Sequence, residues 1–179
     1  ELIGKCLDSL KNINALEVLV IDDNSTDKTV EIAQKRGAKV IVHAKKDFSE
    51  ARNFAFQQAK GEWVLYIDAD EQVSERLSKE INGIPYSNYS AYIITRVNYY
   101  LGKRWPKEEN IIRLFKRKAL KGWVGKLHES PEFTGRVGKL NGELLHFTHR
   151  SLREIVEKTI VWSEIESKLR YDVNHPPVS

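Results

Sequence analysis

Apolar positions in the first half of the chain alternate between helical and strand spacing. Residues 2–11 carry apolar side chains three and four positions apart, which is typical of a helix buried on one face. Short apolar runs at 17–21, 39–43 and 63–67 predict buried strands. The intervening helices, each opened by Ser, Thr or Asp, are expected within 25–37, 49–60 and 74–81. This alternation predicts an α/β fold with a mostly parallel sheet flanked by helices.

The second half of the chain has a different pattern. Residues 91–100 and 111–116 are rich in aromatic and β-branched side chains and predict strands, and several glycines follow them. These features favour an antiparallel portion at one edge of the sheet. Ser151 and Glu154 form a capping box, which predicts a long terminal helix that ends near Tyr171.

The composition narrows the class of protein. The chain has 179 residues, 41% of them hydrophobic and 30% charged, which suits one globular domain over 1–179. The net charge of +4 and the pI near 9.0 favour anionic ligands without selecting one. With Cys6 as the single cysteine, no internal disulfide can form. No apolar run is long enough to span a membrane, so we expect a cytoplasmic protein.

Carboxylates directly follow two of the predicted strands. Asp22 and Asp23 follow the first strand, and Asp68 and Asp70 follow the third. In parallel α/β sheets, ligands bind outside the carboxyl ends of the strands. The repulsion among Asp68, Asp70 and Glu71 is relieved by a divalent cation such as Mg²⁺ or Mn²⁺, which prefers oxygen ligands. The alternative interpretation is a solvated acidic turn that caps the next helix.

Two further groups suit a nucleotide. One carboxylate of the Asp22-Asp23 pair could accept the imide N–H of a uracil, although turn chemistry explains part of this segment. Arg52 is expected in the first turn of a helix, where its fork of donors matches a phosphate. A surface arginine is the alternative.

Transfer to a hydroxyl group needs a base that takes the proton of the acceptor. Glu129, beside a histidine in a predicted loop, is the candidate, and a surface His-Glu pair is the alternative. His146 and His149 precede the last helix, and one of them could complete a metal shell or bind phosphate. We assign His146 to the metal.

Five strings occur in an order and spacing that resemble the family 2 glycosyltransferases with the GT-A fold. They are VIDDNSTD, SEARNFA, YIDADE, RLF and VGKLHE, at 20–27, 49–55, 66–71, 113–115 and 124–129. Within the family, the chain is most similar to the bacterial lipopolysaccharide-core β-glucosyltransferase group. The resemblance implies an inverting transfer of a sugar from a nucleoside diphosphate to a hydroxyl group.

The resemblance also implies a role for each candidate residue. Residues 1–90 would bind the nucleotide, with Asp22 and Arg52 near it. Asp23 would contact the nucleobase, and Asp68 would face the ribose or the metal. Residues 91–179 would bind the acceptor, with Glu129 as the catalytic base. Asp70 would ligate a Mg²⁺ or Mn²⁺ cofactor on the diphosphate. Family members begin with a strand that this chain lacks, so we expect upstream residues in the natural protein.

The expected partners follow from the same resemblance. The donor would be a nucleoside-diphosphate sugar, UDP favoured, and the acceptor a glycan or a lipid-linked glycan. Lipopolysaccharide biosynthesis would place the protein in the cytoplasm, with peripheral contact at the inner face of the cell membrane. Two other function classes stay open at this point, a nucleotidyltransferase and a non-catalytic polyanion-binding domain. The basic residues are dispersed and not interleaved with aromatics, so no nucleic-acid partner is expected.

Overall fold

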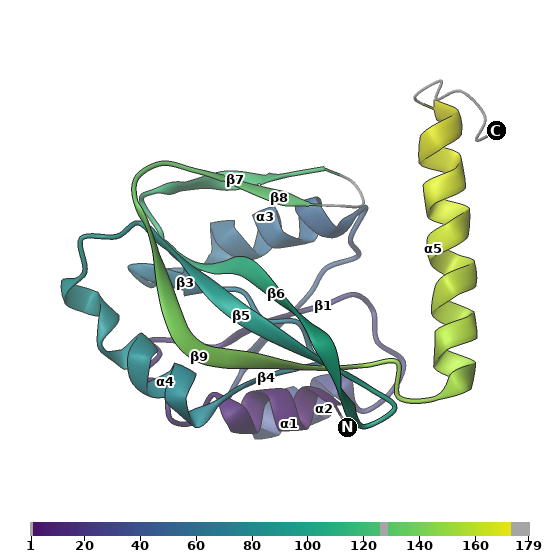
Figure 1. Cartoon of the computed structure of the whole chain (residues 1–179), viewed down its shortest axis with the longest axis horizontal. Helices are drawn as coiled ribbons and strands as arrows, with labels where there is room; N and C mark the ends of the chain where they lie inside the picture. Colours follow the sequence, from purple (N-terminus) through teal and green to yellow (C-terminus); the bar gives the residue numbers. More distant parts are fainter. Residues whose placement is uncertain (1, 126–128, 173–179) are drawn as a thin grey trace.

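The computed structural model describes residues 2–125 and 129–172, and the strands of this part form three sheets (Figure 1). The strands are β1 Leu19–Asp22, β2 Lys39–Val42, β3 Trp63–Leu65, β4 Glu71–Val73, β5 Ala91–Tyr100, β6 Lys103–Lys116, β7 Leu120–Val124, β8 Ser130–Phe133 and β9 Val137–Thr148. The helices are α1 Leu2–Ser9, α2 Thr29–Lys35, α3 Phe48–Gln58, α4 Glu75–Asn82, the short 3₁₀ helix Ile84–Tyr86 and α5 Leu152–Asp172.

The N-terminal half is built as the apolar pattern predicts. β1 and β2 pair in parallel, and α1 and α2 pack against them through a small core that contains Ile3, Leu7 and Ala33. Asp47 caps α3 by accepting a hydrogen bond from the backbone N–H of Glu50. The expected helices and strands are therefore present, with shifts of a few residues at their ends.

A five-stranded sheet in the order β3-β6-β5-β9-β4 forms the centre of the molecule. The α/β class, the antiparallel portion and the long terminal helix are confirmed. Parallel pairing, which was expected for most of the sheet, joins β1 to β2 and β5 to β9. In the central sheet β6 instead pairs antiparallel with β3 and β5, and β4 pairs antiparallel with β9. An apolar run indicates that a strand is buried, but its direction depends on which distant segment lies beside it.

α4 covers the sheet beside β9 and β4. Ser74 caps α4, as predicted, by accepting a hydrogen bond from the backbone N–H of Leu77. The Leu77 side chain is fully buried in the main core. Gly142 of β9 lies against the backbone of Leu77, where a Cβ at position 142 would come within 2.3 Å of the Leu77 Cα atom. The close approach of α4 to β9 therefore depends on glycine at position 142.

Replacing Gly142 by alanine is expected to lower the free energy of unfolding by about 2–4 kcal/mol, because the helix must move off the sheet. Gly83→Ala is the control. Its Cβ would be no closer than 3.4 Å to the Glu80 oxygen, and we expect a change below about 1 kcal/mol. Urea unfolding followed by circular dichroism measures both variants. Equal stability of the two would contradict the role of Gly142.

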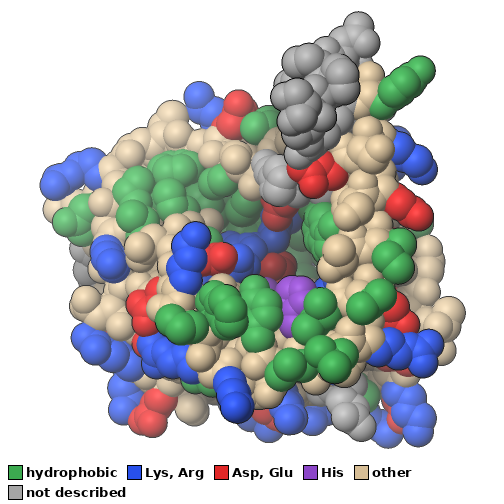
Figure 2. Space-filling model, turned by 45° about the vertical axis from the view of Figure 1, so that its right-hand side comes forward, with side chains coloured by type: hydrophobic (Ala, Val, Ile, Leu, Met, Phe, Trp, Pro, Cys, Tyr) green, Lys and Arg blue, Asp and Glu red, His purple; other side chains and the backbone are tan. Residues whose placement is uncertain are grey.

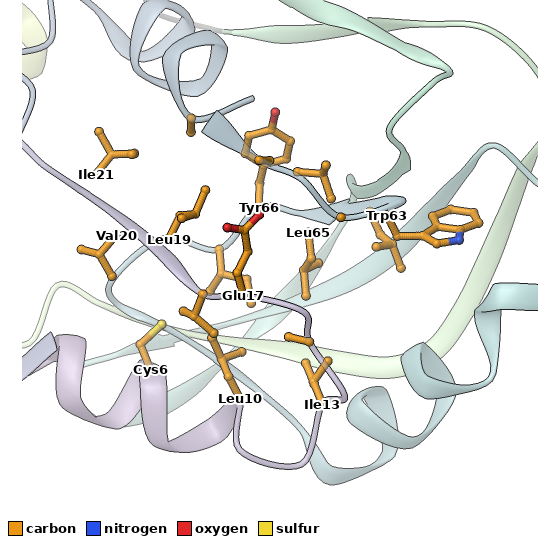
Figure 3. Close-up of a pocket in the computed structure, with 18 of the residues that line it drawn as sticks. Cys6, Leu10, Ile13, Glu17, Leu19, Val20, Ile21, Trp63, Leu65 and Tyr66 are labelled. Carbon is orange, nitrogen blue, oxygen red and sulfur yellow. The ribbon is translucent and has the colours of Figure 1, made fainter. Parts of the chain in front are cut away.

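A cavity of about 690 Å³ lies between β1 and β3 (Figure 3). Apolar side chains from α1, β1 and β3 line it, among them Leu7, Val20 and Leu65. β1 pairs with β2 and β3 pairs with β6, so in the part of the chain that the structure describes the second edge of each strand is unpaired at this cavity. A strand before α1 would fit between these edges, and its presence stays a prediction.

α5 stands apart from the sheet and follows the end of β9 (Figure 1). The backbone N–H of Glu154 donates a hydrogen bond to the Ser151 hydroxyl, as expected for the predicted cap. The ring of Trp162 stacks on Phe48 of α3 at 5.8 Å between centroids. Among the described residues, no helix combines the length and the apolar character needed to cross a membrane.

Candidate active site

The candidate site lies where β1 and β3 end. The two-stranded parallel sheet brings Asp22 and Asp23 to its carboxyl edge, and the turn between β3 and β4 carries Asp68 and Asp70. The backbone N–H of Glu71 donates to the Asp68 carbonyl, which closes this turn. Figure 2 shows a hollow between the body of the molecule and α5, with acidic and basic side chains on its floor and a histidine at its rim.

Two arginines hold the carboxylate of Asp68. Arg52 Nη2 donates to Oδ1 at 3.1 Å, and Arg113 Nη2 donates to Oδ2 at 2.9 Å. Burial raises the pKa of Asp68, but the charges of Arg113 and Arg52 outweigh burial and hold that pKa below its usual value. Asp68 is therefore ionised and fixed in orientation.

Arg52 connects Asp68 to the candidate base. Its Nε donates to Glu129 Oε1 at 3.1 Å, and its guanidinium lies 4.8 Å from the centre of the Trp123 ring. The Arg52 side chain is only 11% exposed. Arg52 was predicted to lie near the nucleotide. In the structure its hydrogen bond also positions Glu129. The neighbouring residues 126–128 of the VGKLHE string lie outside the described part of the chain.

The two carboxylates after β1 have different surroundings. Asp22 is buried, and its carboxylate accepts a hydrogen bond from the backbone N–H of Ser25, so it shapes the turn. Asp23 is 45% exposed at its side chain and pairs with Lys45 Nζ at 2.9 Å. This hydrogen bond with Lys45 lowers the pKa of Asp23. Of the pair, Asp23 is the one that an incoming ligand can reach.

Asp70 and His146, the predicted metal ligands, lie together. His146 Nε2 is 3.4 Å from Asp70 Oδ2, and the backbone oxygen of Asp70 accepts a hydrogen bond from Phe147 N–H of β9. His146 Nδ1 lies 2.7 Å from Asn98 Oδ1, which can only accept, so Nδ1 carries the proton. In the neutral ring the lone pair of Nε2 then faces Asp70, an arrangement that suits a cation between them.

These two side chains fit a Mg²⁺ or Mn²⁺ that takes its other ligands from phosphate and water. The described residues contain no cluster of three or more His, Cys, Asp or Glu side chains placed to hold a metal. The ring of His149 stacks on Tyr100 at 4.8 Å between ring centres. Burial lowers the pKa of His149, and the nearby charge of Lys158 lowers it further.

Three further residues belong to this site. Arg113 and Lys158 were not identified as site groups from sequence, whereas Glu71 was named there as part of the acidic string. Arg113 is buried on β6; its Nη2 donates to Asp68, and its Nη1 has no hydrogen-bond partner among the described residues. Glu71 is fully buried and accepts a hydrogen bond from the backbone N–H of Asp68. Burial raises the pKa of Glu71, and the charge of Asp68 raises it further. Lys158 of α5 lies 4.0 Å from Asp70 Oδ2.

Of Arg113 and Lys158, sequence could have indicated only Arg113. Arg113 begins the RLF string, which lies within the predicted strand at 111–116. Lys158 lies among many other charged residues of the predicted terminal helix.

The acidic edge and its paired arginines lie at the carboxyl ends of the strands, where α/β proteins generally bind their ligands. The sequence model of "Glycosyl transferase family 2" matches residues 1–145. The chain belongs to glycosyl transferase family 2. Of the function classes left open by the sequence, glycosyl transfer is therefore the one supported.

Similar proteins agree with this assignment. The glycosyltransferase RP128 of Rickettsia prowazekii is 33% identical over 183 residues, which cover 93% of this chain and 62% of the relative. SunS of Bacillus subtilis, a prophage-derived glycosyltransferase, is 30% identical over 136 residues, which cover 72% of this chain and 31% of SunS. The chain thus spans about 62% of the length of the Rickettsia relative.

A solved structure supports the fold. S. aureus TarS, residues 1–349 in complex with UDP-GlcNAc, superposes with a TM-score of 0.59 at 17% identity, over 85% of this chain and 56% of TarS.

Proposed function

We propose that the protein transfers a sugar from a UDP-sugar to a hydroxyl group of a glycan or a lipid-linked acceptor, with inversion at the sugar. The observation that carries this proposal is the chain of contacts from Asp68 through Arg52 to Glu129. It supports the proposal because Arg52 contacts both Glu129, the candidate base, and Asp68 of the acidic edge that would receive the donor.

The reaction is a single displacement. The acceptor oxygen forms a bond to C1 of the sugar while the bond from C1 to the diphosphate oxygen breaks, and the diphosphate keeps the electron pair. Glu129 takes the proton of the acceptor hydroxyl. Arg52 holds Glu129 in place through an ion pair of 3.1 Å.

The donor would lie along the acidic edge. Asp23 is exposed at one end of this edge, where it could accept the imide N–H of the uracil. Asp70 and His146 would hold Mg²⁺ or Mn²⁺ on the diphosphate, which supplies electrostatic stabilisation of the leaving group. Asp68 is already paired with two arginines, so we assign it to the ribose side or to a supporting place near the cation.

The finer assignment is to the lipopolysaccharide-core β-glucosyltransferase group, with UDP-glucose as the donor. It rests on the order and spacing of the five strings at 20–27, 49–55, 66–71, 113–115 and 124–129, and it makes a lipid-linked acceptor at the inner face of the cell membrane part of the same proposal. UDP-GlcNAc is the second donor to test, since TarS was solved with it.

Calorimetry with UDP-, GDP- and ADP-sugars, each with Mn²⁺, tests the proposed function. We expect the UDP-sugars to bind with micromolar to millimolar dissociation constants, the range of ordinary substrate affinities. The same titrations in EDTA should give weaker binding, because the diphosphate then lacks its cation. Absence of binding for every sugar nucleotide would contradict the proposed function. A preference for GDP- or ADP-sugars would show that the nucleobase of the donor is guanine or adenine and not uracil.

A further inference from the structure

One face of α5 turns toward the acidic edge of the sheet. Glu154, Lys158 and Trp162 are four residues apart and therefore share this face. Their side chains are more covered than those of the other face: Glu154 is 19% and Lys158 is 34% exposed, against 87% for Arg153. The hollow in Figure 2 lies between this face and the body of the molecule.

Aromatic contacts connect α5 to the body on the side of Asp23. The Trp162 ring stacks on Phe48 at an interplanar angle of 12°. Lys45 Nζ lies 4.9 Å from the centre of the Phe48 ring and forms an ion pair with Asp23. α5 is thus attached beside the residue that we assign to the base of the nucleotide.

Lys158 connects α5 to the other acidic loop. Its Nζ lies 3.1 Å from Glu154 Oε1, 3.2 Å from Thr148 Oγ1 and 4.0 Å from Asp70 Oδ2. The pair with Glu154 is ordinary, since oppositely charged residues four apart on a helix attract weakly in most proteins. The approach to Asp70 is different, because Asp70 belongs to the turn between β3 and β4 and lies 88 positions earlier in the chain.

We propose that Lys158 of α5 binds the diphosphate of the nucleotide donor. This inference rests on the proposed function, and it assigns to the terminal helix a direct part in the donor site. α5 would then form one wall of the hollow, attached by Trp162 near the base and by Lys158 near the phosphates.

Charge and reach support this assignment. A lysine beside an acid that holds a cation would repel that cation, unless an anion lies between the two positive groups. A diphosphate supplies such an anion. The ammonium sits on a flexible four-carbon stem, so it can leave Asp70 and reach a phosphate oxygen bound next to it. During transfer the diphosphate gains negative charge as the bond to C1 breaks, and a fixed positive charge stabilises this state.

Calorimetry with UDP and with uridine tests the proposal, using Lys158→Gln and the control Lys168→Gln. Lys168 lies further along the same helix and is exposed. In Lys158→Gln we expect the affinity for UDP to fall about tenfold, both with Mn²⁺ and in EDTA. The affinity for uridine, which has no phosphate, should not change. Lys168→Gln should bind both as the unchanged protein does, and Lys158→Arg should recover part of the UDP affinity.

Three outcomes would overturn the proposal. If Lys158→Gln binds UDP as the unchanged protein does, Lys158 does not contact the diphosphate. If Lys158→Gln loses affinity for uridine and UDP equally, Lys158 only holds α5 in position. A lowered melting temperature of this variant would accompany such a structural role. If the unchanged protein binds no UDP, the proposed function itself fails, which is a different result from the first two.

Discussion

Replacing Glu129 by glutamine is expected to lower the rate of sugar transfer by about 10²–10⁴-fold, the scale of a positioned base. Glutamine has the shape of glutamate and can still accept the hydrogen bond from Arg52 Nε, which is 3.1 Å from Glu129 Oε1. It cannot take the proton of the acceptor hydroxyl. The loss should therefore fall on kcat, while the dissociation constant of the donor stays within about threefold of its original value.

Glu132→Gln is the matched control. Glu132 lies on β8, three residues from Glu129, and is exposed. Initial rates with saturating UDP-sugar give kcat, and calorimetry gives the donor affinity. Full activity of Glu129→Gln would move the role of base to another residue, and loss of donor binding would make Glu129 a binding group instead.

Local features of the fold were predictable because they depend on near neighbours. The strand at 91–100 matches β5 at both ends, and Ser74 and Ser151 accept the capping hydrogen bonds expected of them. Apolar runs and cap residues act within one turn or one strand, so the sequence shows them directly. The pairing of β3 with β6 joins residues about 50 positions apart, and periodicity carries no information about such a pairing.

Only part of the candidate site was predictable from the sequence. Asp70 and His146 were assigned together, and the structure brings them to 3.4 Å because β4 pairs with β9 beside them. Their metal role stays a prediction. Arg113 and Lys158 were not assigned to the site, since each reaches Asp68 or Asp70 only through tertiary packing. Charged residues on helices and strands are too common for sequence alone to select these two.

The pairing of Asp68 also changes how the acidic string is interpreted. In the sequence, Asp68 and Asp70 are two carboxylates two residues apart, and only the family resemblance separates Asp68, on the ribose or the metal, from Asp70, on the metal. In the structure both oxygens of Asp68 are taken by guanidinium groups, whereas Asp70 faces a histidine and a lysine in the hollow. Asp68 therefore organises Arg52 and, through it, Glu129. Asp70 is the carboxylate that remains available to a cation with a bound diphosphate.

Asp70→Asn is accordingly expected to lower transfer by about 10³-fold or more and to remove the effect of Mn²⁺ on UDP binding. Asparagine keeps the size of the side chain and loses its charge, while the backbone bond from Phe147 N–H to the oxygen of residue 70 is kept. The measurement is the ratio of UDP dissociation constants in EDTA and in Mn²⁺. This ratio should be well above one in the unchanged protein and close to one in Asp70→Asn.

Asp8→Asn is the control for Asp70→Asn. Asp8 lies on α1 and pairs with Arg36 at 3.1 Å, away from the hollow. Its replacement should leave both the ratio and the rate unchanged. An Asp70→Asn variant that keeps the Mn²⁺ effect would show that the cation is held elsewhere, because His146 alone offers a single nitrogen and a hard cation prefers oxygen. If the ratio is one even in the unchanged protein, Mn²⁺ does not contribute to UDP binding, and the assignment of a cation to Asp70 is wrong.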